Sequence, residues 1–256
     1  MFLRGNFNSS GLVRLLGEWS GGDAEAPRQD LAERLAHWLG VADAITLHAA
    51  QQTVRAARPL PATRGTPRDG VPLAAQLQQV RATLERAIRA DDLAELVGQP
   101  SVVRAGNGAD QAASAQAGRD DAAADYALYH QRYLDLQRRM EMAIDALRGH
   151  MRQALARQSP RLARLAALDA VLDPMLGGRE QQLLGTVPGH LKHRFEQLRR
   201  AADADWRPRF AADVQQALLA ELDLRLQPVL GLVEAQAHET PTPQEPREVQ
   251  EVKPHP

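Results

Sequence analysis

The longest uninterrupted apolar pattern of the chain lies between residues 121 and 159. Its large side chains recur at steps of three and four: Tyr126, Tyr129, Tyr133, Leu136, Met140, Ala143, Leu147 and His150. This spacing describes one face of an α-helix and comes close to the heptad of a coiled coil. No proline interrupts the segment. It therefore predicts a helix of roughly 38 residues that is about 57 Å long, and few compact domains contain one of that length.

A second apolar stripe follows after a predicted turn. Ser159 offers a hydroxyl group that can cap a helix, and Pro160 stands where a first-turn proline is tolerated. The second stripe comprises Leu162, Leu165, Leu168, Val171 and Leu172. We expect it to run back along the first helix as a hairpin whose apolar residues form a core. Asp173-Pro174 is expected to bend or break this second helix.

Aromatic residues make up only 4% of the chain, although hydrophobic residues make up 44%. Leucine and alanine must therefore supply most of the buried surface. Helix-on-helix packing accepts these residues, whereas a β-sandwich depends on β-branched and aromatic ones. We therefore expect an all-α fold, namely an elongated helical bundle with a long hairpin and no β-sheet.

The apolar pattern divides the chain into six parts. They are an N-terminal helical head (1–57), a linker (58–72), a helix (73–97), a flexible loop (98–120), the long hairpin or bundle (121–236) and a disordered tail (237–256). Proline and glycine punctuate the linker, and the loop has few large apolar side chains. Near the C-terminus, Pro188 is acceptable in a first helical turn and Pro228 is expected to kink the last helix.

The chain contains no cysteine. This excludes disulfides, thiolate metal sites and cysteine nucleophiles. The N-terminus lacks the apolar segment of a secretory signal, and no apolar run approaches the ~18 residues that a membrane helix needs. We expect a cytoplasmic protein that does not insert into a membrane.

Few residue patterns point to catalysis or to a metal site. His190 and His193 lie three apart on a predicted helix and could reach one metal, but no third ligand is evident. Two exposed imidazoles are the simpler interpretation. Asp203 and Asp205 are more simply a charge pair at a helix start than metal ligands. Gly106-Asn107-Gly108 lacks the lysine and hydroxyl residue of a Walker motif. We therefore predict a non-enzymatic protein without catalytic residues, cofactor or metal.

Basic residues are concentrated in two places, although the net charge is only −1. Eight arginines accompany three acidic residues between positions 132 and 164, and a second basic cluster covers 190–200. An arginine-rich helical face can contact the backbone of a nucleic acid. The candidate contacts are Arg138, Arg139, Arg148, Arg152, Lys192, Arg194 and Arg199. The alternative is an ordinary solvated surface whose charges are balanced by acids on neighbouring helices.

Several stretches of the chain resemble an uncharacterised family of proteobacterial proteins of similar length. They are Leu31–Ala50 (LAERLAHWLGVADAITLHAA), Tyr129–Leu136 (YHQRYLDL), Ser159–Arg199 (SPRLARLAALDAVLDPMLGGREQQLLGTVPGHLKHRFEQLR) and Leu218–Glu234 (LLAELDLRLQPVLGLVE). The likeness extends from residue 10 to 235, and its motifs are packing patterns without catalytic residues. Members of this family tend to be encoded beside a MotA-like proton channel and an OmpA-like peptidoglycan-binding protein. That gene set is similar to one subtype of the Zorya anti-phage defence system.

The resemblance implies a cytosolic accessory component of an ion-driven membrane motor. We therefore expect a helical subunit that acts by protein–protein contacts with the motor components of its gene cluster. The alternative is an effector that binds nucleic acid through its arginine-rich helical face. The tyrosine stripe could close an intramolecular bundle or pair with a second copy, so a homo-oligomer stays open.

Overall fold

The computed structural model describes residues 10–20, 40–56, 71–90, 111–201 and 205–239. Within these residues all regular secondary structure is α-helical, which confirms the all-α prediction. The elements are α1 (Gly11–Ser20), α3 (Val41–Ala56), α4 (Leu73–Arg89), α5 (Gln111–Ala156), α6 (Pro160–Leu184), α7 (Val187–Arg200), α8 (Trp206–Arg225) and α9 (Gln227–Glu239).

Helix α5 is the longest element and contains 46 residues. At 1.5 Å per residue it is about 69 Å long. It begins at Gln111, so the prediction of a flexible loop over 98–120 is wrong for residues 111–120. Alanine and glutamine are good helix formers, and they favour the helix there although the segment has no large apolar residues at helical spacing. Residues 98–110 lie outside the described part of the chain.

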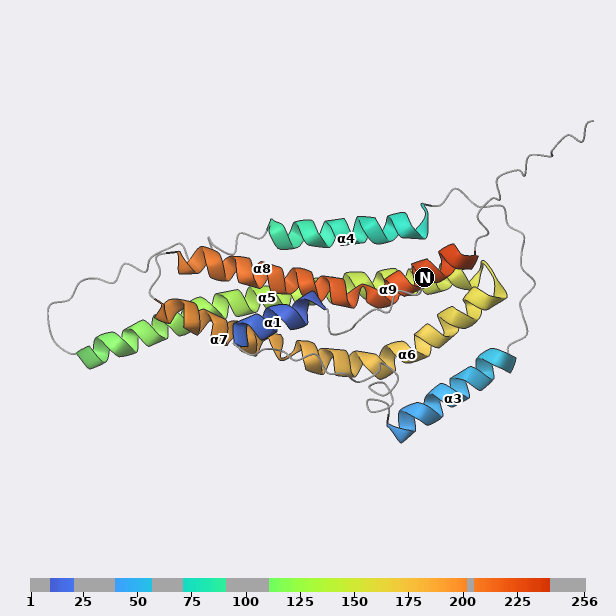
Figure 1. The fold of residues 1–256 in the computed structure, drawn as a ribbon, viewed down its shortest axis with the longest axis horizontal. Coiled ribbons are helices and arrows are strands. Elements are labelled where there is room, and N and C mark those ends of the chain that lie inside the picture. Colours follow the sequence, from blue (N-terminus) through green and yellow to red (C-terminus); the bar gives the residue numbers. More distant parts are fainter. Residues whose placement is uncertain (1–9, 21–39, 57–70, 91–110, 202–204, 240–256) are drawn as a thin grey trace, which may run out of the picture.

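The predicted hairpin is confirmed. Helix α6 folds back beside α5 (Figure 1), and the Oγ atom of Ser159 accepts a hydrogen bond from the backbone N–H of Leu162 at 3.2 Å. Pro160 occupies the first position of α6. The hydroxyl group of Ser159 also donates to Oε1 of Glu239, at the end of α9, at 2.9 Å. The end of α9 is therefore fixed beside the hairpin turn.

Asp173-Pro174 was expected to bend or break the second helix, and it does not break it, because α6 continues through Pro174 to Leu184. A proline inside a helix removes one backbone hydrogen bond and strains the preceding turn. Helix α6 packs against α5 on one side and α3 on another, and this packing offsets part of the cost of the proline. Pro188 behaves as predicted, whereas the last helix, expected to kink at Pro228, is divided into α8 and α9. Pro188 lies in the first turn of α7, and Pro228 follows the break between α8 and α9.

The core runs along α5, where α7, α8 and α9 cover it. Tyr129 and Tyr133 are buried, which confirms that the tyrosine stripe belongs to the core. His150, at the end of that stripe, is exposed, so its predicted place on the buried face is wrong. A group of aromatic rings stabilises the end near α7: Phe195 lies 5.1 Å from Phe210 between ring centroids, edge to face. Such pairs add about 0.5–1.5 kcal/mol beyond their buried area.

The remaining helices cover different sides of this body. Helix α4 packs on α5, α8 and α9, and α1 packs on α7 and α8, whereas α3 lies along α6 (Figure 1). The two described helices of the predicted head (1–57) are thus attached to different parts of the bundle. The helix predicted over 73–97 is α4, which ends at Arg89, and the predicted linker and tail lie mostly outside the described residues. No described helix has both the length and the apolar character that crossing a bilayer requires.

Candidate functional site

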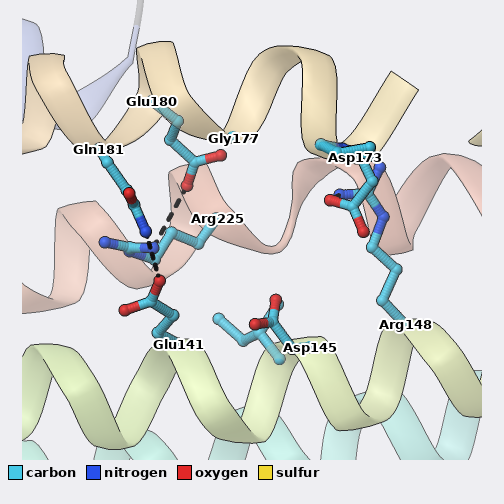
Figure 2. Close-up of a pocket in the computed structure, with 10 residues that line it drawn as sticks. Glu141, Asp145, Arg148, Asp173, Gly177, Glu180, Gln181 and Arg225 are labelled. Atoms are coloured by element: carbon cyan, nitrogen blue, oxygen red, sulfur yellow. Dashed lines mark hydrogen bonds and ion pairs between the residues drawn. The ribbon is translucent and has the colours of Figure 1, made fainter. Parts of the chain in front are cut away.

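A cleft of about 250 Å³ separates α5 from the second half of α6. Figure 2 shows that its lining side chains come from these two helices and, in the case of Arg225, from α8. The lining residues are Glu141, Ile144, Asp145, Arg148, Asp173, Pro174, Gly177, Glu180, Gln181 and Arg225. Four of them are acidic and two are arginines, so charged groups occupy a region where a hairpin normally places apolar side chains.

The guanidinium group of Arg148 joins the two helices at one end of the cleft. It binds both carboxylate oxygens of Asp169, with distances of 2.6 Å from Nη2 to Oδ1 and 2.9 Å from Nε to Oδ2. Its Nη1 atom lies 2.5 Å from Oδ1 of Asp173. Arg152 donates to Oδ2 of the same aspartate at 2.9 Å. Bidentate pairs of this kind are the strongest class of protein ion pair.

The other end of the cleft is connected to the buried interior. Arg225 lies 3.4 Å from Oε1 of Glu180 on α6 and donates through Nε to Oε1 of Glu221 at 2.8 Å. Glu221 is 0% exposed. Its carboxylate also accepts hydrogen bonds from the hydroxyl group of Tyr133 at 2.6 Å and from Nε2 of Gln137 at 2.9 Å. These contacts satisfy a buried charge that would otherwise be costly.

Burial changes the proton affinity of several of these groups. It raises the pKa of Glu180, and this effect exceeds the opposite effect of the nearby Arg225 and Arg148. Burial also raises the pKa of Asp145, with a further contribution from the charges of Asp173 and Glu141. The pKa of Tyr133 is raised by burial and by the adjacent Glu221. Glu180 and Asp145 therefore bind a proton more tightly in the folded protein than in the unfolded chain.

The lining residues offer charge and hydrogen bonds, and the ten of them include no histidine, serine or threonine. What this arrangement does is hold α5, α6 and α8 together through polar contacts. The cleft can in addition take up protons at Glu180 and Asp145.

Three of the seven predicted nucleic-acid contacts form ion pairs within the protein, and four are exposed. Arg148 and Arg152 meet at the cleft, where they bind Asp169 and Asp173, and Arg194 donates to Oδ2 of Asp213 at 2.8 Å. These three charges are balanced within the protein. The exposed members of the set are Arg138, Arg139, Lys192 and Arg199. The guanidinium group of Arg199 also lies over the ring of Phe195, 5.9 Å from its centroid.

The two histidines of α7 differ in exposure. His190 is half-buried, whereas His193 is exposed. Among the residues that the structure describes, no three histidine or acidic side chains gather where they could hold a metal ion. Asp203 and the run Gly106-Asn107-Gly108 lie outside the described residues, and Asp205 directly precedes α8.

Glu221 was not singled out in the sequence analysis. The position itself carries a signal. Glu221 lies seven residues after Val214 and three after Leu218, so it falls on the buried stripe of α8. A charged residue on such a stripe predicts a buried polar partner. The pattern does not indicate that the partner is Tyr133 on α5.

Comparison with known proteins places the chain in a family. No curated protein and no solved structure matches the chain significantly. A family model described as "Protein of unknown function (DUF3348)" matches residues 2–238. The matched region contains the hairpin, all the residues that line the cleft, and Glu221 with its partners. The chain therefore belongs to the DUF3348 family of proteins of unknown function.

Proposed function

We propose that this protein is a non-enzymatic helical subunit that acts through protein–protein contacts. One observation carries the proposal: the N-terminal end of α5 extends past α7 and α8 (Figure 1). A helix that projects from a bundle offers a face on which a partner helix can pack. Leu128 lies on α5 next to Tyr129, which contacts α7 and α8, and is therefore close to where the projecting part begins. Its side chain is 49% exposed, so a partner could cover it.

The partner that we propose is the cytoplasmic side of a MotA-like and OmpA-like membrane motor in phage defence. Support for this partner comes from the resemblance of the sequence to an accessory component of Zorya-type systems. In this proposal the protein is cytosolic, and α5 supplies the rod that reaches the motor. The ion pairs of the cleft keep the hairpin in the shape that presents the rod.

Co-expression of the tagged protein with the two motor components tests the proposal. We expect a complex that survives purification and that Leu128→Glu weakens. Leu183→Glu is the matched control, because Leu183 is 57% exposed but lies on α6. Circular dichroism should show the same helix content for both variants. Absence of a complex, or equal weakening by both substitutions, would count against the proposal.

The alternative function is binding to a nucleic-acid backbone, and the exposure of Arg138 and Arg139 on α5 favours it. Each phosphate contact adds to the salt dependence of such binding. If this function is correct, the protein binds DNA at low salt and Arg138→Glu/Arg139→Glu weakens binding. The control is Arg86→Glu/Arg89→Glu, which changes the same charge on the exposed face of α4. Failure of the protein to bind heparin at low salt would reject this alternative.

A further inference from the structure

We propose that the middle of α6 (residues 168–183) opens away from α5 while both ends of the helix stay anchored. This inference is independent of the proposed function. It starts from the distribution of burial along α6. The buried residues of α6 are Leu162 and Ala166 at its beginning and Leu184 at its end.

The apolar residues between these anchors are only half-buried. They are Leu168, Val171, Leu172, Met175 and Leu176. In contrast, the opposing part of α5 places Met140, Ile144 and Leu147 in the core, which α4, α8 and α9 also line. Opening of the middle of α6 therefore costs less hydrophobic free energy than separation of any other part of the hairpin.

Polar contacts connect the middle of α6 to the rest of the bundle across the cleft. Asp169 and Asp173 bind Arg148. Gln181 donates to Oε1 of Glu141 at 2.8 Å, as Figure 2 shows. Water that enters the cleft can solvate both partners of each contact. In the closed position salt screens the more exposed Asp173, at 28%, more than Asp169, at 12%. When the cleft is open, water and salt screen both partners of each ion pair, so salt favours the open position.

The helix is also intrinsically weak at this place. Pro174 cannot donate a backbone hydrogen bond, and each of Gly177 and Gly178 costs about 1 kcal/mol of helix stability relative to alanine. Apart from the neighbouring residues and the nearby backbone of α6 itself, no atom lies within 4 Å of the place where a Cβ atom would stand on either glycine. Packing therefore does not require glycine at these positions, and alanine would fit.

Helix α3 moves with the middle of α6 in this inference. It packs along α6, and Nη2 of Arg179 lies 3.2 Å from Oδ2 of Asp43 near the start of α3. That contact joins α3 to the stretch that opens, not to α5.

Hydrogen exchange of the full chain tests the inference. We expect backbone amides of residues 168–183 to exchange faster than those of 140–155, and their rate to rise several-fold with salt. The variant Gly177→Ala/Gly178→Ala should slow this exchange about tenfold or more, because each replacement of glycine by alanine stabilises the helix. Gly149→Ala on α5 is the matched control, since its Cβ position is also open. It should leave the exchange of α6 unchanged.

Thiol labelling gives a second measurement, because the chain contains no cysteine. Ile144→Cys places a thiol on the α5 side of the cleft, and Leu155→Cys places one in the core as a control. We expect a thiol reagent to modify the first faster, with a rate that rises with salt. Equal rates at the two positions would overturn the inference. So would exchange in 168–183 that is as slow as in α5, or that neither salt nor the alanine pair alters.

Discussion

The hydroxyl group of Tyr133 donates a 2.6 Å hydrogen bond to Oε2 of Glu221, although the two residues are 88 positions apart in the chain. This bond crosses the core from α5 to α8. Gln137 and Arg225 complete the shell around the carboxylate. A buried charge with such partners favours one register of two packed helices, because any shift along the axis leaves it unsatisfied.

Replacement of the tyrosine hydroxyl should therefore be costly. We expect Tyr133→Phe to lower the free energy of unfolding by about 1–3 kcal/mol, because it leaves one oxygen of a buried carboxylate without its donor. Urea denaturation followed by circular dichroism measures the change. Tyr126→Phe is the control, since its half-buried hydroxyl group donates to the backbone oxygen of Pro188 and its loss should cost less. An equal effect of both variants would contradict the special role of the Glu221 contact.

The tyrosines should titrate abnormally. The chain has three, and burial raises the pKa of Tyr126 to about 12 and also raises the pKa values of Tyr129 and Tyr133. The native protein should therefore show less tyrosinate absorbance at pH 10 than the denatured chain, which should be half ionised near that pH. A native titration curve that matches the denatured one would contradict the burial of the stripe.

The same shifts fix the sign of the alkaline pH dependence. A group whose pKa is raised in the folded state stabilises the fold fully below its unfolded pKa of about 10. That stability is lost as the pH rises towards the folded pKa. We expect the urea midpoint to fall above pH 10, and tyrosinate absorbance to appear together with unfolding. Stability that stays constant up to pH 12 would disagree with this linkage.

The pair Arg148–Asp169 should couple strongly, because both side chains are only 12% exposed. A double-mutant cycle with Arg148→Ala and Asp169→Ala should give a coupling energy of about 0.5–3 kcal/mol at low salt. The exposed pair Arg200–Glu196 on α7 is the control and should give about 0.3–0.5 kcal/mol. Coupling at the cleft that does not exceed the control would argue against this ion pair as a link between α5 and α6.

The hairpin turn should depend on its cap. Ser159→Ala removes the acceptor for the backbone N–H of Leu162 and should cost about 1 kcal/mol of stability. Thermal unfolding measures this loss. Ser159→Asn restores a capping oxygen, so its midpoint should return most of the way to that of the unaltered protein. If the asparagine variant is as unstable as the alanine variant, the cap is not the cause.

The sequence predicted those helices whose limits depend on residues close together in the chain. The hairpin follows from helix spacing and from Ser159-Pro160, which act within a few residues of one another. The sequence did not predict the start of α5 at Gln111, because this alanine-rich segment has no large apolar residues at helical spacing. The continuity of α6 through Pro174 depends on packing partners distant in the sequence.

The cleft was harder to predict from the sequence than the helices were. Arg148 and Arg152 were singled out for their charge, but the effect of that charge depends on Asp169 and Asp173 across the hairpin turn. A sequence shows the excess of arginine, not its partners. Glu221 is similar, since its environment is set by Tyr133 and Gln137 from another helix. Residues that act in pairs across the fold are found only when the fold is known.

The contact of Glu239 with Ser159 makes the two ends of the bundle different. It places the end of α9 at the hairpin turn, so the described chain finishes at the pole opposite to Gln111. A protein or surface that holds the carboxyl-terminal end would leave the start of α5 pointing outward, about 69 Å away along the rod. The bundle thus has the geometry of a spacer with two distinct ends, and an attachment at one end leaves the other free.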